Sequence, residues 1–253
     1  MGDAALHCSA RLLALGDSAW TVEYGHRIDA AVHARVMGLA DRLSQARSTD
    51  PRLAGVTDVV PTFRSLTVHF DPWVCDGRAL GGHLEQLAAE TALVAHTGRH
   101  WHLPVCFDED FAPDLPRVCE RSGLPRRAVI DRLLGTRFRV YMLGFQPGFP
   151  YMGGLPSALA TPRLPSPRQK VPARSVAIAL DMCAVYPWES PGGWNLLGRT
   201  PAVLFDPAAG PPAMLSAGDE VTWDAVDRVT HDRLVQDIAH GLPREHFLQG
   251  RAA

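Results

Sequence analysis

The basic side chains between Gly144 and Thr200 are the residues whose type and spacing most clearly suggest chemistry. They are Arg163, Arg168, Lys170, Arg174 and Arg199. Only Asp181 and Glu189 balance them within this stretch. Guanidinium groups beside aromatic side chains and oriented backbone amides readily receive carboxylate or phosphate groups. The stretch therefore predicts an anion-binding surface, with solvated surface cations as the alternative for any single residue.

Glycine, proline and aromatic residues are concentrated in the same stretch. Glycine and proline at this density are typical of ordered loops that take special backbone dihedral angles or lie close to a ligand. Tight turns of a β-barrel are the alternative. Four aromatic side chains can form a flat apolar wall, although such side chains more often belong to a core. They are Tyr151, Tyr186, Trp188 and Trp194.

Common catalytic motifs do not occur in this stretch. It contains no histidine and no Gly-x-Ser-x-Gly, P-loop or Gly-x-Gly-x-x-Gly sequence, so a self-contained Ser–His–Asp hydrolase is not expected. Before the stretch, His100 and His102 would share one face of a strand, close to His96. No nearby cysteine or paired carboxylate completes a metal site there, so we expect solvent-facing histidines and no bound metal.

The composition is that of an ordinary globular protein. The chain has 253 residues, of which 46% are hydrophobic and 21% charged, and its formal net charge is -2. This balance argues against nucleic-acid and membrane partners, which favour a basic face. No apolar run approaches the roughly 20 residues that span a bilayer, and the N-terminus has no signal-peptide pattern. The five cysteines are scattered, which predicts reduced thiols and a cytoplasmic location.

The first part of the chain predicts an α/β layer. Turn signals, period-two alternation and helical periodicity define its elements. They are a hairpin within residues 9–24, a helix over 28–47, strands over 56–60 and 65–71, a helix over 79–95 and a strand over 100–107. The order strand–helix–strand–strand–helix–strand suggests a ferredoxin-like domain over residues 1–107, closed by the last strand.

The rest of the chain predicts a β-rich domain framed by helices. Residues 108–135 are typical of two short helices, split near Gly123, that link the domains. Short strands and turns dominate residues 136–228, which favours a β-barrel. Residues 229–253 are expected to form a helical tail. The predicted fold class is therefore α+β, with an α/β domain followed by a barrel.

Several sequence blocks together carry a family resemblance. Inside the glycine-rich stretch the blocks are Gly144–Leu155, Thr161–Ala173, Tyr186–Pro187 and Ser190–Thr200. Elsewhere they are Leu15–Ala19, Val60–Pro72, Pro113–Leu115, Leu204–Pro207 and Ala217–Asp219. These blocks resemble the family of the 5-oxoprolinase B subunit, also called allophanate hydrolase subunit 1, which includes a sporulation-kinase inhibitor. The resemblance covers about residues 9–225.

The resemblance implies a cyclophilin-like barrel and a chain that is one part of a larger enzyme. Family members act with a homologous C subunit, or are fused to it, and with an additional A subunit they hydrolyse 5-oxoproline to glutamate using ATP. We therefore expect a small amide or lactam substrate, ATP that is used by the complex but not held by this chain alone, and no metal or biotin here. The alternatives are an inhibitor of a histidine kinase, or the carboxyltransferase half of a biotin-dependent urea or amide carboxylase with a separate biotin carrier.

The resemblance and the residue chemistry together suggest a substrate site without an assigned catalytic residue. Opening a stable lactam benefits from phosphorylating its carbonyl oxygen, and the resulting anion needs fixed cations and oriented amides rather than a protein nucleophile. We expect Arg163 and Arg168 to bind the anion. Tyr151 and Trp194 would form the pocket wall. The full expected set is Tyr151, Arg163, Arg168, Tyr186, Gly192, Gly193, Trp194 and Arg199, with the two glycines allowing close backbone approach.

Four places depart from the family pattern. Leu133 stands where relatives carry a histidine, and Arg174 where they carry a glycine. Ala179–Ala184 replaces a run containing glycine and glutamine, and Asp108–Ala112 replaces a glycine-rich loop. A glycine at positive φ cannot become arginine without strain, so the local loops must differ, or Arg174 fills space that a ligand normally occupies. We expect specificity to lie at Arg174 and Met182, and a paralogue with an altered substrate is a further alternative.

Overall fold

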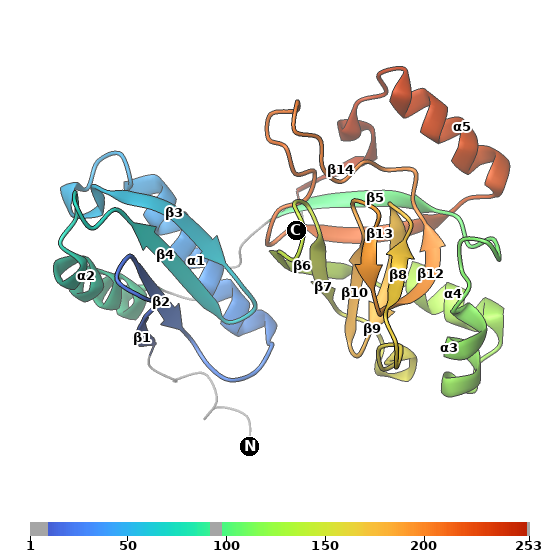
Figure 1. Ribbon diagram of the computed structural model, residues 1–253, viewed down its shortest axis with the longest axis horizontal. Coiled ribbons are helices and arrows are strands. Elements are labelled where there is room, and N and C mark those ends of the chain that lie inside the picture. The colour runs from blue at the N-terminus through green and yellow to red at the C-terminus, as the bar shows by residue number, and fades with distance from the viewer. Residues whose placement is uncertain (1–9, 92–97, 252–253) are drawn as a thin grey trace. The chain divides into compact units, whose positions relative to one another are not determined.

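The computed structural model describes residues 10–91 and 98–251, which fall into two compact units (Figure 1). One unit comprises residues 1–96 and the other residues 97–253. Each unit has its own hydrophobic core.

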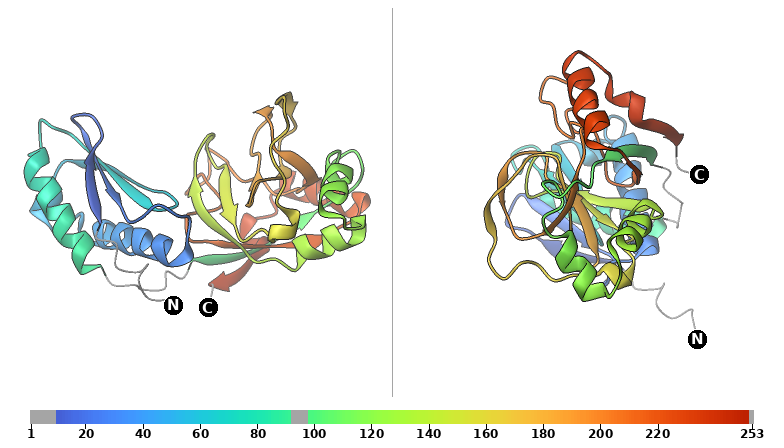
Figure 2. Two further views of the ribbon diagram at one scale, coloured as in Figure 1. Left: turned by 90° about the horizontal axis from the view of Figure 1, so that it is seen from below. Right: turned by 90° about the vertical axis from the view of Figure 1, so that its right-hand side faces the viewer.

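The first unit is a four-stranded antiparallel sheet with two helices against one face (Figures 1 and 2). Its strands, in the spatial order β1-β2-β4-β3, are β1 (Arg11–Ala14), β2 (Ala19–Glu23), β3 (Val56–Pro61) and β4 (Ser65–Phe70). Its helical segments are α1 (Ala30–Ala46), the 3-10 turn η1 (Pro51–Leu53) and α2 (Gly77–Glu90). Asp29 and Asp76 begin the two α-helices, and each side chain accepts two backbone N–H groups of the first turn.

Most of the predicted elements of this unit are confirmed. The hairpin, both helices and the two middle strands occur where the periodicity predicts them. Residues 92–97, which include the predicted end of the second helix and His96, lie outside the described residues.

The strand predicted to close the first sheet belongs to the second unit instead. This strand is β5 (Arg99–Val105), and it lies between β13 (Glu220–Ala225) and β14 (Leu248–Arg251) of the other sheet. Its side chains Trp101, Leu103 and Val105 are buried in the core of the second unit. The described part of the first unit therefore has the order strand–strand–helix–strand–strand–helix, and the predicted boundary after residue 107 is wrong. A pairing partner far away in the sequence leaves no local signal.

The second unit is built on an eight-stranded sheet in the order β12-β9-β10-β7-β6-β13-β5-β14. Besides β5, the strands are β6 (Phe138–Leu143), β7 (Pro150–Gly153), β9 (Ser175–Ala179), β10 (Met182–Val185), β12 (Asn195–Arg199), β13 (Glu220–Ala225) and β14 (Leu248–Arg251). A separate two-stranded ribbon pairs β8 (Arg168–Val171) with β11 (Ser190–Gly192). The 3-10 turns are η2 (Ser157–Leu159) and η3 (Arg244–Phe247).

The sheet curls until distant strands meet at one point. Cys106, directly after β5, exchanges two backbone hydrogen bonds of 2.9 Å with Arg199 at the end of β12. Gly198 permits this approach, because a Cβ there would lie 2.9 Å from the carbonyl oxygen of Cys106. Within the described residues this contact is a single bridge rather than a strand ladder, so the sheet is curled without forming a fully closed barrel.

The segments predicted as a linker and a tail are integral parts of the second unit. Leu115 of α3 (Leu115–Ser122) and Val129 and Leu133 of α4 (Arg126–Leu134) are buried in the same core as the sheet. After α5 (Arg228–Ala239), the chain returns as β14 and pairs with β5. An amphipathic helix is stable only when its apolar stripe is covered, and the nearest apolar surface here is the sheet.

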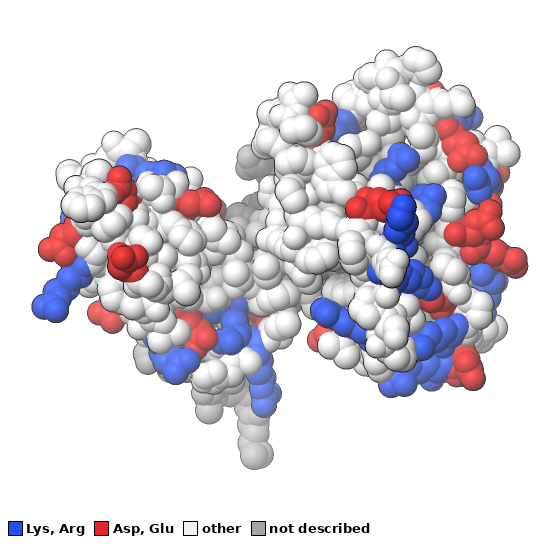
Figure 3. Space-filling model, viewed as in Figure 1, with Lys and Arg blue, Asp and Glu red and all other residues white. Residues whose placement is uncertain are grey.

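The described surface carries charges of both signs. On the face drawn in Figure 3, Lys and Arg atoms alternate with Asp and Glu atoms over each unit. No helix of the described part is long and apolar enough to cross a membrane.

Asp219 ties the start of β5 to the start of β13. Its side chain is almost fully buried, with the residue 2% exposed. It accepts hydrogen bonds from the backbone N–H of Arg99 at 2.8 Å, from the Arg99 guanidinium at 2.9 Å and from the Trp101 indole at 3.0 Å. The backbone N–H of Ser216 adds a fourth bond at 2.9 Å. A buried carboxylate is stable only with such a complete set of donors.

Replacing Asp219 with alanine is expected to lower the free energy of unfolding of the second unit by about 3 kcal/mol, because the Arg99 charge then loses its partner. The matched control is Asp131→Ala, which removes a 59% exposed carboxylate and is expected to cost below about 0.5 kcal/mol. Urea unfolding followed by tryptophan fluorescence measures both variants. Equal losses in the two variants would contradict the role given to Asp219.

Candidate functional site

A cavity of about 250 Å³ lies on the second unit, within the stretch that the sequence singled out. Of the eight predicted substrate-binding residues, six line it. They are Tyr151, Arg163, Tyr186, Gly192, Gly193 and Trp194. Phe145, Phe149 and two prolines complete the lining. The glycine-rich stretch therefore folds around one pocket, where the ends of β7, β10, β11 and β12 come together.

Phe149 forms the centre of the pocket floor. Its ring lies 5.0 Å from that of Tyr151, 5.1 Å from that of Tyr186 and 6.0 Å from that of Trp194, in each case edge to face. Phe149, Tyr186 and Trp194 are buried, so the floor is rigid and apolar. Tyr151 closes the cluster with a ring contact of 6.0 Å to Trp194.

Gly192 makes room for the hydroxyl of Tyr186. A Cβ on Gly192 would lie 2.3 Å from that oxygen, which is far inside van der Waals contact. The close backbone approach predicted for this glycine is therefore an approach to Tyr186. Gly193 is different, because its Cβ would meet Pro167 at an ordinary 3.7 Å. Its carbonyl oxygen accepts a hydrogen bond of 2.7 Å from the backbone of Leu164.

Arg163 is the cation at the rim of the pocket. Its guanidinium carbon lies 5.8 Å from the ring centre of Trp194, and the residue is exposed. The loop that carries it is fixed by buried Asn195, whose side-chain amide donates to the carbonyl oxygen of Pro162 at 3.0 Å. Sequence reasoning missed Asn195, although it follows Trp194 directly in a recognisable block.

Both pocket tyrosines remain neutral phenols. Burial raises the pKa of Tyr151 and of Tyr186, while the Arg163 cation opposes this shift in each case. A neutral phenol can donate a hydrogen bond to a carbonyl or carboxylate oxygen. The pocket therefore combines an apolar floor with hydroxyl donors and one rim cation.

Phe145 is a further lining residue that sequence reasoning missed. It is 64% exposed, and its ring lies 5.5 Å from Phe149, edge to face. Its backbone φ of 66° is in the left-handed region, which residues other than glycine rarely adopt. No pattern in the sequence marks such a residue, although the neighbouring Gly148, at φ 77°, belongs to the same tight turn.

Arg168 is predicted in the anion site but has a partner elsewhere. Its guanidinium donates to Asp114 at 2.7 Å, and the other carboxylate oxygen of Asp114 accepts the backbone N–H of Leu196 at 2.7 Å. Asp114 is 6% exposed, so this is a partly buried ion pair that joins the start of α3 to β8 and β12. The pair positions the strands next to the pocket without placing Arg168 in its lining.

Arg199 and Arg174 lie together outside the cavity lining. The guanidinium carbon of Arg199 stacks 4.3 Å from the ring centre of Phe111. Burial first, and then the neighbouring cations including Arg174, lower the pKa of Arg199. Arg174 donates to the carbonyl oxygen of Pro201 at 3.2 Å. These residues therefore form a separate basic cluster.

Met182, a predicted specificity residue, and Leu133, a predicted departure from the family pattern, also lie outside this cavity. Met182 is buried in β10, opposite Ala179. Leu133 is 2% exposed and belongs to the core.

His100 and His102 share one strand face, as predicted. A ring nitrogen of each forms a hydrogen bond with the hydroxyl of Thr222, at 3.0 Å for His100 and 2.9 Å for His102.

The lining residues can bind and orient a small molecule but offer no nucleophile of their own. Serine, cysteine and histidine are not among the residues that line this pocket, all of which are described. Within the described part of the chain, no group of three or more His, Cys, Asp or Glu residues could hold a metal ion.

Gly192→Ala is expected to destabilise the second unit by about 2 kcal/mol, because the new methyl group overlaps the Tyr186 hydroxyl. Gly193→Ala is the matched control and should change stability by less than about 1 kcal/mol. Thermal and urea unfolding test this difference. The steric account of Gly192 fails if both alanines are tolerated equally.

Arg174 has a φ of 66° although it is not glycine. We expect Arg174→Gly to be more stable than Arg174→Ala by about 1 kcal/mol, since both remove the side chain and only alanine keeps the left-handed strain. Urea unfolding of the two variants isolates this backbone contribution. An alanine variant as stable as the glycine variant would show that residue 174 is unstrained.

The comparison with known sequences gives the family. The family model for the carboxyltransferase domain, subdomain C and D, matches residues 10–215. The B subunit of the 5-oxoprolinase of Bacillus subtilis is 38% identical over 220 residues, which cover 83% of this chain and 90% of that protein. The corresponding B subunit of Haemophilus influenzae is 42% identical over 168 residues, covering 66% of this chain and 78% of that protein.

Several solved structures are also similar to this chain. A conserved uncharacterized protein from Pyrococcus horikoshii is 34% identical, with a TM-score of 0.52 and coverage of 87% of this chain and 100% of that chain. The urea carboxylase of Kluyveromyces lactis has a TM-score of 0.73 at 20% identity, a likeness of fold alone. It is much longer, since the match covers 90% of this chain but 23% of the urea carboxylase. A further solved protein, of which this chain spans 40%, has a TM-score of 0.71 at 34% identity. The chain therefore belongs to the carboxyltransferase-domain family of subdomains C and D, together with the B subunits of 5-oxoprolinases.

Proposed function

We propose that the chain is the B subunit of an ATP-dependent 5-oxoprolinase-type hydrolase that acts on a small amide or lactam. The observation that carries this proposal is the aromatic pocket around Phe149, with Arg163 at its rim and no nucleophile in its lining. Such a pocket suits a small flat ring with a carboxylate. The curated relatives, which this chain matches over most of their length, are named as B subunits of 5-oxoprolinases.

The proposed role of the pocket is to bind and orient the substrate. The lactam ring would rest on the floor formed by Phe149 and Trp194, and Arg163 would pair with the carboxylate. The phenols of Tyr151 and Tyr186 would donate to a substrate oxygen. Oriented donors in a dry pocket stabilise charge that develops on a carbonyl oxygen, and phosphorylation of that oxygen by ATP makes the amide easier to open.

The remaining parts of the active site would come from partner proteins. We propose that a homologous C subunit completes the pocket and that an additional A subunit takes part in the ATP-dependent step, with ATP not held by this chain alone. We also propose that the curled sheet of the second unit is a cyclophilin-like barrel, which the bridge between Cys106 and Arg199 supports.

A second candidate function is the carboxyltransferase half of a biotin-dependent amide carboxylase. The description of the matching family model favours it. In that case a separate biotin carrier would bring the carboxyl group to the same pocket.

Reconstitution separates the two candidates. The chain is mixed with homologues of the C and A subunits from the same genome, and ATP-dependent conversion of 5-oxoproline to glutamate is measured with each protein omitted in turn. We expect activity only in the complete mixture. Unchanged activity without this chain would overturn the proposal, and activity that requires bicarbonate and a biotinylated carrier would favour the second candidate.

Arg163→Gln in the reconstituted complex is expected to raise KM by about tenfold with little change in kcat, because a charged hydrogen bond to the bound carboxylate is lost. Lys170→Gln is the matched control, since this cation is 80% exposed and pairs with Glu189 at 3.4 Å. Steady-state kinetics at a fixed ATP concentration measure the effect. An Arg163→Gln enzyme with wild-type KM would remove this residue from the substrate site.

A further inference from the structure

A second cavity lies on the outer face of the sheet in the same unit. In the parallel pair β5 and β13, Thr222 is the register partner of His102, and Asp224 that of Pro104. The alternate residues, such as Leu103 and Trp223, are buried in the core. Because side chains alternate across a strand, His102, Pro104 and Asp224 face the other way. They form the floor of the second cavity, which has a volume of about 310 Å³.

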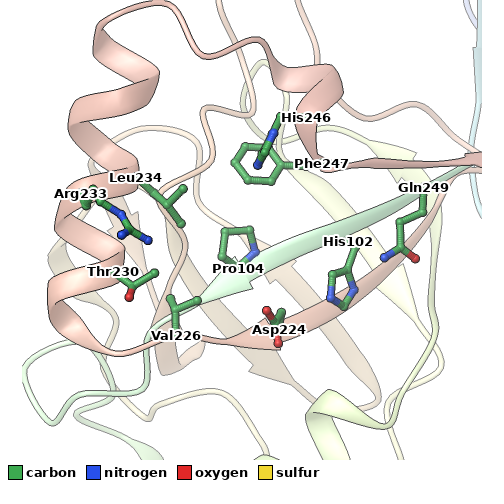
Figure 4. Close-up of a pocket in the computed structure, with 10 residues that line it drawn as sticks. All are labelled: His102, Pro104, Asp224, Val226, Thr230, Arg233, Leu234, His246, Phe247 and Gln249. Atoms are coloured by element: carbon green, nitrogen blue, oxygen red, sulfur yellow. The ribbon is translucent and has the colours of Figure 1, made fainter.

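The C-terminal segment covers this floor. Helix α5, the turn η3 and strand β14 all contribute side chains to the cavity (Figure 4). Pro104, Leu234 and Phe247 form an apolar middle (Figure 4). Except for His102 and Pro104, the lining residues follow residue 215, where the match to the family model ends. The cavity is therefore built mainly by a part of the chain beyond that match, and it shares no lining residue with the pocket around Phe149.

The two ends of the cavity carry opposite charges. Arg233 and Thr230, both from α5, lie at one end (Figure 4). Asp224, His102 and Gln249 lie at the other end (Figure 4). Arg233 and Asp224 are exposed, and neither makes an ion pair within the described residues. A charge close to Arg233 is the Asp227 carboxylate, whose pKa is lowered by hydrogen bonds from Thr230 and then by the Arg233 charge.

His102 adds polarity to the acidic end. Its Nδ1 atom is 2.9 Å from the hydroxyl oxygen of Thr222, which fixes the ring and leaves Nε2 for a ligand. The same hydroxyl is 3.0 Å from Nε2 of His100. One hydroxyl has a single proton, so at least one of these two imidazole nitrogens donates to it.

We propose that this cavity binds a small zwitterion of the amino-acid class. Its carboxylate would pair with Arg233 and Thr230, and its ammonium group with Asp224 beside His102. Its side chain would lie on Pro104, Leu234 and Phe247. A molecule with only a carboxylate, or only an amine, would satisfy one end and leave the other charge unpaired. The proposal is independent of the function proposed for the pocket around Phe149.

The test begins with the full chain and the twenty free L-amino acids, screened by thermal shift and followed by calorimetry. We expect amino acids with apolar side chains, such as leucine, to bind. 4-Methylpentanoate, which is leucine without its ammonium group, and isoamylamine, which is leucine without its carboxylate, should each bind at least about tenfold more weakly. The proposal is overturned if no amino acid binds at about 10 mM, or if either single-charge analogue binds as well as the zwitterion.

Substitutions of the charged lining residues test whether the amino acid binds in this cavity. Arg233→Gln and Asp224→Asn are each expected to weaken amino-acid binding at least about tenfold. The matched controls are Arg127→Gln and Asp131→Asn, whose side chains are 92% and 59% exposed on α4, and both should bind as the natural chain does. Circular dichroism verifies folding of each variant. Unchanged binding in Arg233→Gln contradicts the proposal, and so does loss of binding in Arg163→Gln, which would place the ligand in the first pocket.

Discussion

The edge-to-face packing of Phe149 against Tyr151, Tyr186 and Trp194 is the contact on which the candidate site depends. Phe149 and Tyr151 lie at the start of β7, Tyr186 follows β10 and Trp194 precedes β12, so the curled sheet must bring these three strand ends together before a pocket exists. The packing also explains Gly192, because only a residue without a side chain leaves room for the Tyr186 hydroxyl. A floor made of buried rings is rigid, and a rigid floor can orient a small ligand at low entropic cost.

Sequence reasoning could predict most of the pocket lining because its residues belong to recognisable blocks within one stretch of the chain. Several lining residues belong to blocks rich in glycine and proline, a composition that indicates an ordered loop. They are Tyr151, Tyr186, Gly192 and Trp194. The helices and hairpin of the first unit are equally predictable from the sequence, since local periodicity and caps such as Asp29 define them. Helical periodicity, caps and hairpin turns depend on near neighbours in the sequence.

What the sequence could not predict depends on distant partners. Arg168 resembles a free cation in the sequence, but it pairs with Asp114, and Arg199 stacks on Phe111. Strand β5 pairs with β13, which is far away in the chain, and so joins the second sheet. The left-handed backbone of Phe145 has no sequence signal at all. Arg174 keeps a left-handed φ although it is not glycine, and it lies outside the pocket. Leu133 and Met182 likewise do not line the aromatic pocket.

A crystal structure of this chain in complex with the proposed C subunit, grown with 5-oxoproline, tests most directly whether the aromatic pocket binds the substrate. We expect the lactam ring to lie on the floor formed by Phe149 and Trp194, with its carboxylate within hydrogen-bond distance of Arg163. Density for 5-oxoproline at another place in the complex, with this pocket free of ligand, would contradict the account.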